Sequence, residues 1–254
     1  MTAFGQSQRQ SNAEAMSTGG PCLIKLGGSL LELPDLRARL RSLLATMIPE
    51  VPAIIVGGGR SADLVRSWQV LHGLSESAAH WLAIRAMSLN AQLVCSLDSC
   101  FRRVDDSETW SAAVSRRKVP VLDVVRLLRA AEATTAIDER LPESWDVTSD
   151  SITIWIARQW RIPRVVLVKS TSIPSELLNC GTPIRTESNT EESSVDQPCV
   201  APDGRRLTGF RRSLAENLNK AGLVDAYFPV IAPEIPFLDW CDLNQAHPER
   251  ISLW

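Results

Sequence analysis

A lysine stands inside a short apolar segment that ends in two glycines and a serine. Residues 21–29 read PCLIKLGGS, and the apolar residues favour a strand buried on both faces. A lysine in such a strand must find an anion or lose its charge, and glycines let backbone N–H groups approach a ligand closely. Lys25, Gly27, Gly28 and Ser29 therefore indicate a phosphate site at the end of the strand. A surface lysine beside an ordinary glycine turn fits this segment alone equally well.

A second apolar segment ends in three glycines. Residues 53–56 read AIIV, and Gly57, Gly58 and Gly59 follow them directly. Three successive glycines can present several N–H groups to an anion, together with the positive end of the helix expected after them. A flexible turn is the alternative. The chain contains neither G-x-x-x-x-G-K-[ST] nor G-x-G-x-x-G, which disfavours a P-loop enzyme and a Rossmann dehydrogenase.

An aspartate and a second lysine complete the set of candidate groups. The apolar spacing of residues 152–160 indicates a helix with Asp150 at its N-terminus, where the helix dipole and free N–H groups stabilise an anion. A simple capping role is the alternative for Asp150. Lys169 lies near the end of a third apolar strand, residues 164–171. Such a set suits phosphoryl transfer, which needs positioning and charge neutralisation more than covalent help.

The elements that must position these groups follow from apolar spacing. Two strand-to-glycine-loop units separated by one helix make a parallel βαβ arrangement. The helix near 75–101 carries one apolar face, and Ser75 or Ser77 could cap it. That face consists of Leu82, Ala86, Leu89, Leu93 and Leu97. Strands are predicted near 21–30, 53–56, 119–122, 164–171 and 223–231, and helices near 35–47, 75–101, 124–133, 148–160 and 208–222.

Length and composition indicate one globular α/β domain. The chain has 254 residues, enough for one domain of ample core or two small ones, and no break in composition requires two. We expect a disordered polar tail at 1–19, a single domain at 20–254 and a mobile polar loop near 175–206. No apolar stretch approaches the roughly 20 residues that a membrane span requires.

Charge and cysteine usage exclude other classes. A formal net charge of -2 gives no broad basic field, which disfavours nucleic acid as a partner. The six cysteines are scattered, without metal-ligand spacing, so we predict reduced thiols in a cytoplasmic protein and no metal held by protein side chains alone.

The motifs, in their order, resemble those of the amino acid kinase family. They are KLGGS at 25–29, GGG at 57–59 and TSDS at 148–151. Within the family the chain resembles the archaeal-type kinases that act on [5-(aminomethyl)furan-3-yl]methyl phosphate in methanofuran biosynthesis. The segments that carry this closer resemblance are 57–66, 80–84, 144–151, 224–229 and 247–250. Together they are distributed over most of the chain from Cys22 onward.

The resemblance implies a fold, cofactors and residue roles. The fold would be a three-layer αβα sandwich with an open, mainly parallel sheet of about eight strands, and the cofactors ATP and Mg²⁺. Lys25 would neutralise the transferring phosphoryl group, Asp150 would hold that lysine, and Gly27, Gly28, Gly57 and Gly58 would donate N–H groups. Ser29, Lys169, Ser170 and Thr171 would lie at the nucleotide phosphates. The acceptor would meet Gly57, Gly58, Gly59, Asp63, Arg66, His80, Trp145 and Thr148.

The implied acceptor is a small phosphate monoester. Its second pKa is about 6, so at pH 7 its oxygen is already an anionic nucleophile that needs no general base. This agrees with glycine loops that contain no histidine. Isopentenyl phosphate kinases are disfavoured, because their characteristic histidine beside the glycine loop is replaced by Arg60 and Ser61.

Two alternatives to this activity remain open. Lys169, Ser170 and Thr171 are similar to a segment of bacterial uridylate kinases, which favours a nucleoside monophosphate kinase. The second alternative is a non-catalytic protein that binds a nucleotide or oxyanion. It is suggested by residues 172–175 (SIPS), which stand in place of the usual Asp-Gly nucleotide loop. Family members are commonly dimers or larger, so we also expect a homo-oligomer.

Overall fold

The structure is a computed structural model that describes residues 19–132, 135–136, 140–179, 204–246 and 248–254. Its centre is one sheet of seven strands, which supports the predicted αβα fold with a strand count close to the expected eight. The strands are β1 (Pro21–Leu26), β2 (Val51–Val56), β3 (Phe101–Val104), β4 (Val119–Leu122), β5 (Arg164–Lys169), β6 (Phe237–Asp242) and β7 (Arg250–Ser252). Their order is β3-β4-β2-β1-β5-β6-β7, and β7 alone among them pairs antiparallel.

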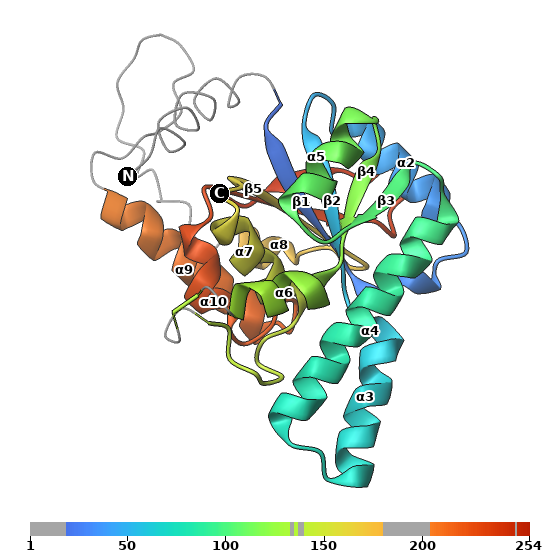
Figure 1. The fold of residues 1–254 in the computed structure, drawn as a ribbon. Coiled ribbons are helices and arrows are strands. Elements are labelled where there is room, and N and C mark those ends of the chain that lie inside the picture. The colour runs from blue at the N-terminus through green and yellow to red at the C-terminus, as the bar shows by residue number, and fades with distance from the viewer. Residues whose placement is uncertain (1–18, 133–134, 137–139, 180–203, 247) are drawn as a thin grey trace, which may run out of the picture.

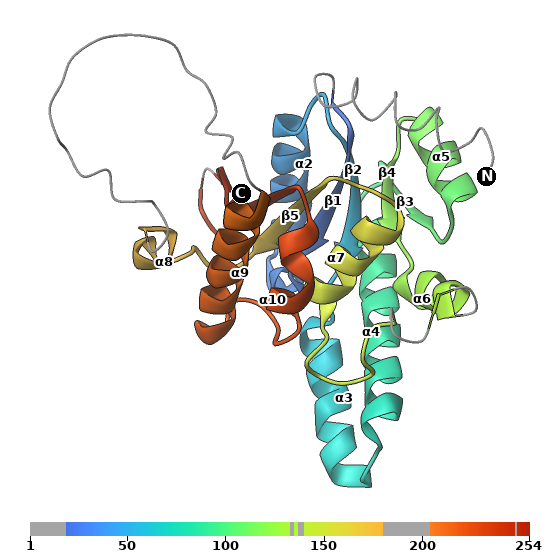
Figure 2. The same ribbon diagram turned by 90° about the vertical axis from the view of Figure 1, so that its left-hand side faces the viewer.

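Helices cover both faces of this sheet (Figures 1 and 2). They are η1 (Gly28–Glu32), α2 (Leu36–Thr46), α3 (Gly59–His72), α4 (Glu76–Leu97), α5 (Ser107–Ser115), α6 (Val124–Glu132), α7 (Ser149–Gln159), α8 (Ser175–Asn179), α9 (Gly204–Lys220), α10 (Phe228–Ile231) and η3 (Ala232–Glu234). One core cluster lies between the sheet and α6, α7, α9 and α10, and the other between the sheet and α2. Such a two-sided core is what buries a mostly parallel sheet.

Strand β1 occupies the centre of the sheet, between β2 and β5, and it is parallel to both. The predicted βαβ unit, β1-α2-β2, is therefore confirmed. Side chains alternate along a strand, so Lys25 shares the face of Leu23, which packs in the cluster with α7. Ile24 and Leu26 point to the opposite face, against α2. The alternation thus aims the lysine of a central strand at the helix that carries Asp150.

The strand predicted at 223–231 is wrong. The segment forms a turn followed by the short helix α10, with Pro229 in its first turn. Proline fits the start of a helix but cannot donate to a strand ladder, and Asp225 Oδ1 accepts a hydrogen bond from the backbone N–H of Phe228 at 3.0 Å. The sequence interpretation also missed β3, α5, β6 and β7, of which three are strands of six residues or fewer.

The long helix α4 is confirmed, but its predicted apolar face coincides only in part with its buried face: Ala86 is buried, and Leu82 and Leu97 are half-buried. Ser75 caps it, accepting a hydrogen bond from the N–H of Ala78 at 3.2 Å. Leu89 and Leu93, however, are 62% and 44% exposed. The buried side instead carries two polar residues among its apolar ones: His80, Ile84, Ala86, Met87, Asn90, Ala91 and Val94. Both views show α3 and α4 as a hairpin that extends beyond the sheet (Figures 1 and 2).

Parts of the predicted tail and loop lie outside the described residues. Of the tail at 1–19 only residue 19 is described, and of the loop near 175–206 only α8 and the start of α9. Cys180 and Cys199 also lie outside, whereas the four described cysteines are free. Among the described residues, we find no helix with the length and apolar character to span a membrane.

Candidate active site

The two glycine loops lie back to back at the ends of β1 and β2. These strands pair in parallel with Leu26 opposite Val56, so the loops that follow them meet. A Cβ added to Gly28 would lie 2.1 Å from the backbone nitrogen of Gly59. Gly59 has a φ of +48°, and its Cβ would lie 2.5 Å from the carbonyl oxygen of Gly28. Glycine is therefore needed at both positions, so that one backbone can approach the other.

The backbone amides of these loops divide into two groups. The N–H of Gly27 donates to Val168 O and that of Gly57 to Leu26 O, both at 2.8 Å. These two amides are not available to a phosphoryl group, contrary to the role predicted for them. Gly28 and Gly59 instead begin η1 and α3, and Gly58 directly precedes α3. The first N–H groups of a helix have no partner within it, so these three amides are the candidate donors.

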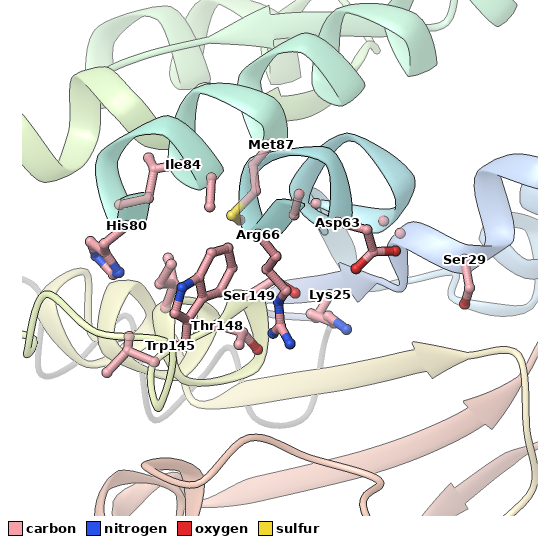
Figure 3. Close-up of a pocket in the computed structure, with 17 residues that line it drawn as sticks. Lys25, Ser29, Asp63, Arg66, His80, Ile84, Met87, Trp145, Thr148 and Ser149 are labelled. Atoms are coloured by element: carbon pink, nitrogen blue, oxygen red, sulfur yellow. The ribbon is translucent and has the colours of Figure 1, made fainter. Parts of the chain in front are cut away.

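A cavity of about 240 Å³ opens beside these amides (Figure 3). It brings together ten of the residues predicted for the site, from Lys25 to Thr148. These are Lys25, Gly28, Ser29, Gly58, Gly59, Asp63, Arg66, His80, Trp145 and Thr148. The sequence interpretation missed the apolar side of the cavity, to which α4 contributes Ala83, Ile84 and Met87. Gly27, Gly57, Asp150, Lys169, Ser170 and Thr171 do not line it.

One carboxylate holds both predicted lysines. Lys25 Nζ lies 2.9 Å from Asp150 Oδ1, and Lys169 Nζ donates to Asp150 Oδ2 at 2.8 Å. Lys25 and Asp150 are each only 4% exposed. Because β1 and β5 are neighbours and Asp150 begins α7 above them, the sheet and one helix set this geometry.

Electrostatics keeps the carboxylate ionised. Burial raises the pKa of Asp150, but the ammonium groups of Lys169 and Lys25 lower it by more than burial raises it. The pKa of Asp150 therefore lies below the ordinary aspartate value. Burial lowers the pKa of Lys169 to about 8, although Asp150 opposes this shift. The group of three therefore carries an excess positive charge at neutral pH, which suits an anionic ligand.

The remaining predicted nucleotide residues lie around the end of β5. Lys169 Nζ also donates to Leu223 O at 2.8 Å. Ser170 Oγ lies 2.9 Å from Ser29 Oγ, which connects the first glycine loop to this strand end. Thr171 is exposed beyond it, and its carbonyl oxygen accepts from Trp240 Nε1 at 3.0 Å.

Asp225 anchors the first turn of α7, and the sequence interpretation gave it no role. Its Oδ2 accepts from the backbone N–H groups of Thr148 and Ser151, at 2.9 and 3.1 Å, and from Thr148 Oγ1 at 2.8 Å. Burial and the charge of Asp150 raise the pKa of Asp225, against the hydrogen bonds that lower it. The predicted acceptor residue Thr148 thus already donates its hydroxyl within the protein, and Asp225 fixes the turn that carries Asp150.

Another part of the cavity lining is an arginine stacked on a tryptophan. The guanidinium carbon of Arg66 lies 4.3 Å from the centre of the Trp145 ring, and Trp145 Nε1 donates to Gln69 Oε1 at 2.5 Å. His80 is buried, and its Nδ1 donates to Ser144 O at 3.1 Å. Asp63 is exposed on the same cavity. Figure 3 shows Arg66 and Trp145 between His80 and Lys25.

Comparison with known proteins identifies the fold. No family model matches the sequence. The [5-(aminomethyl)furan-3-yl]methyl phosphate kinase of Methanocaldococcus jannaschii is 27% identical over 147 residues, which are 57% of this chain and 63% of that protein. The match thus spans less than two thirds of the relative's length. The uridylate kinase of Archaeoglobus fulgidus superimposes with a TM-score of 0.52 at 15% identity, over 86% of this chain and 88% of that one.

The chain has the amino acid kinase fold. The resemblance to this family predicted from the motifs is thereby confirmed. A second structure, the UMP kinase of Bacillus anthracis, has a TM-score of 0.49 at 10% identity, over 89% of this chain and 88% of that one.

On this amino acid kinase fold, the site can hold a phosphoryl group. A buried lysine, three helix-start amides and an exposed arginine converge on one cavity, and each is a group that binds phosphate oxygens. Within the described residues we find no cluster of three or more His, Cys, Asp or Glu side chains that could hold a metal ion. Since Mg²⁺ is usually bound through one or two carboxylates and the substrate phosphates, this donor set is compatible with Mg²⁺ that arrives with a nucleotide.

Proposed function

We propose that the protein is an ATP-dependent kinase that phosphorylates a small phosphate monoester to a diphosphate. The observation that carries this proposal is the group Lys25–Asp150–Lys169 beside the amide-lined cavity. Two cations on one buried carboxylate have no evident use in a protein core, because desolvated charges are costly. Beside an anion site, the same arrangement supplies positive charge where phosphoryl transfer needs it.

In the proposed reaction, each residue has a separate task. An oxygen of the acceptor phosphate attacks the γ-phosphorus of ATP, the bond from that phosphorus to the β,γ-bridging oxygen breaks, and ADP leaves. Lys25 and the amides of Gly28, Gly58 and Gly59 neutralise the transferring group. Mg²⁺, bound through the phosphates, would add charge neutralisation there. Because the attacking oxygen is already ionised at pH 7, no side chain needs to remove a proton.

The nucleotide is proposed to lie on the side of β5. Lys169 Nζ points to Asp150 from this strand, and Ser29 and Ser170 connect it to the glycine loop. The proton of Lys169 would remain in place while anionic oxygens approach, since added negative charge raises the pKa of an ammonium group. Asp150 is a positioning residue in this scheme, because it touches both lysines and does not line the cavity.

The cavity suits an acceptor with a ring and a positive charge. The M. jannaschii relative is named for [5-(aminomethyl)furan-3-yl]methyl phosphate, and we propose the same acceptor here, in the synthesis of a methanofuran-type C1 cofactor. Arg66 would bind its phosphate, the apolar residues of α4 and Trp145 would flank the ring, and Asp63 would attract the ammonium group. Asp63 is the acidic side chain among the described residues that line this cavity.

An acceptor panel tests the proposal against its two rivals. Purified protein with ATP and Mg²⁺ is given the furan phosphate, UMP, the other nucleoside monophosphates and simple phosphate monoesters, and release of ADP is followed. We expect the furan phosphate to give the highest kcat/KM. Preference for UMP would favour the uridylate kinase hypothesis, which Lys169, Ser170 and Thr171 suggest. Tight binding of ATP by calorimetry, with no acceptor that raises ADP release, would favour a non-catalytic nucleotide-binding protein.

A further inference from the structure

A buried asparagine on α4 contacts the second glycine loop. Asn90 is 4% exposed, and its Nδ2 donates to Gly57 O at 2.7 Å and to Gly58 O at 2.8 Å. Its Oδ1 accepts from Ser61 Oγ at 3.2 Å. Two carbonyl acceptors require the NH₂ group and a hydroxyl donor requires the oxygen, so these partners together fit one orientation of the carboxamide. All the hydrogen-bonding atoms of this side chain are therefore directed at the loop.

Because the peptide bond is planar, these contacts to the carbonyl oxygens also set the direction of the neighbouring N–H groups. In a trans peptide, the C=O of one residue and the N–H of the next point in opposite directions. The carbonyl of Gly57 belongs to the same peptide as the N–H of Gly58, and the carbonyl of Gly58 to that of Gly59. Holding the two oxygens against α4 thus turns the two N–H groups away from α4. Gly58 and Gly59 line the cavity, whereas Asn90 does not.

The glycine loop needs hydrogen bonds of this kind to restrain it, because glycine is conformationally free. Three successive glycines have no side chains to restrict their φ and ψ angles, and peptides between them can rotate at little steric cost. An amide donor contributes to catalysis only when it is already aimed at the place where charge develops. The Gly58 carbonyl also accepts from the Ala62 N–H at 3.2 Å, and Asn90 adds a contact that joins this carbonyl to that of Gly57.

We infer that Asn90 is a positioning residue that aims the Gly58 and Gly59 amides at the bound phosphoryl group. This inference rests on the proposed function, since it assumes that a phosphoryl group binds at these amides. Asn90 itself does not line the cavity and does not touch the reacting atoms.

Three variants distinguish a change in the orientation of the Gly58 and Gly59 amides from a loss of protein stability. Asn90→Asp keeps the shape but replaces the donor with oxygen, so that it repels both carbonyls. Asn90→Leu removes the polar contacts at similar volume. Gln92→Ala is the matched control, because it removes an exposed side-chain amide from the same helix. We expect kcat, measured with the best acceptor of the panel, to fall by about 10- to 100-fold in both Asn90 variants. The KM for ATP should change less than about threefold.

Glycine labelling reports the two amides directly. With glycine labelled at its carbonyl carbon and nitrogen, an HNCO spectrum selects glycines that follow a glycine, namely Gly20, Gly28, Gly58 and Gly59. Adding the nonhydrolysable analogue AMP-PNP with Mg²⁺ should shift the Gly28, Gly58 and Gly59 proton signals downfield in the wild type. In both Asn90 variants the Gly58 and Gly59 shifts should shrink at saturation, while the Gly28 shift remains and thermal unfolding shows a folded protein.

The outcomes distinguish this inference from the function on which it rests. Gly58 and Gly59 shifts of wild-type size in folded Asn90 variants would overturn the positioning role and leave the kinase proposal standing. A wild-type protein that binds AMP-PNP without moving any of these glycine signals would overturn the proposed phosphate site itself.

Discussion

The centre of the site holds unequal charges: the ammonium groups of Lys25 and Lys169 share the carboxylate of Asp150. Neither lysine is fully compensated, and both are largely buried, so the group retains a positive field that water screens poorly. A bound phosphate would complete the charge balance. At the residue scale, the proposed site is thus a buried group with an excess of positive charge.

The pH dependence of activity should report Lys169. Its pKa lies at about 8, so raising the pH through 8 removes its proton and one of the two cations that bind phosphate. We expect kcat/KM for ATP to fall with an apparent pKa near 8 on the alkaline side, since this parameter reports the free enzyme. In Lys169→Arg the fall should move to higher pH, because arginine stays charged.

Loss of folding would not explain that fall. The Lys169 pKa is lower in the folded chain than the ordinary 10.5, so this residue alone makes the free energy of unfolding rise between about pH 8 and 10.5. An alkaline limb at the same pH in the wild type and in Lys169→Arg would show that another group controls activity.

The sequence allowed prediction of some of these residues and not of others. Lys25 and Asp150 could be found because each is a charged residue in an apolar pattern, where a partner is required. Asp225 could not, since its partners Thr148 and Ser151 lie 77 and 74 residues away. In the sequence, Asn90 is one polar residue of a predicted helix. Its contact with the glycine loop is seen only in the folded structure. Polar residues whose partners are distant backbone groups leave no local signal.

At the scale of elements, the site depends on two loops that pack without side chains. The sequence predicted the glycines for contact with phosphate, and the structure adds a second requirement. Gly28 and Gly59 are the closest points between the β1 and β2 loops. The same positions therefore serve packing and amide presentation, which spacing alone could not separate.

A pair of glycine variants tests this packing. In Gly28→Ala the new Cβ would meet the nitrogen of Gly59 at 2.1 Å, so the loops must separate. We expect a loss of about 3 kcal/mol in the free energy of unfolding, as for severe overpacking, and loss of most activity. Gly73→Ala is the control: Gly73 has a φ of +61° but no atom within 4 Å of an added Cβ. It should cost about 1 kcal/mol and leave kcat unchanged.

Urea unfolding and steady-state kinetics measure both glycine variants. Equal effects of the two substitutions would contradict the packing argument, because both would then reflect general backbone strain alone.

Helix α4 shows why a correct helix can have a wrong face. Its leucine row suggested the core side, but Leu89 and Leu93 are exposed, and the buried side carries His80 and Asn90. Polar groups thus occupy positions where a purely structural helix would carry apolar ones. Periodicity finds the helix, yet it cannot decide which of two surfaces will be covered.

At the scale of the whole molecule, the order of motifs was sufficient to predict the fold class. Strands, glycine loops and the α7 terminus follow each other as the amino acid kinase family requires, so one central sheet follows. The edge of the sheet was less predictable. β7 has three residues, all exposed, and neither its length nor its burial gives a pattern that sequence can reveal.

The predicted homo-oligomer remains a prediction, and the α3–α4 hairpin is where we propose to test it. Exposed apolar side chains gather there, namely Leu64, Trp68, Val70, Leu71, Leu89 and Leu93. Exposed apolar surface of this kind commonly marks an interface. Sedimentation velocity should show a dimer or larger species, and Trp68→Glu should shift it toward the monomer. A wild-type monomer at micromolar concentration would contradict the prediction.

³¹P NMR of the reaction itself is the most direct test of the proposed kinase activity. Wild-type protein is incubated with ATP, Mg²⁺ and [5-(aminomethyl)furan-3-yl]methyl phosphate, and spectra are taken against a matched Lys25→Ala sample. We expect the monoester signal to be replaced by the two coupled signals of a diphosphate, with one ADP formed for each diphosphate, and Lys25→Ala to slow this reaction by about 10²-fold or more. An unchanged monoester signal in the wild-type sample, or equal rates in the two samples, would contradict this expectation.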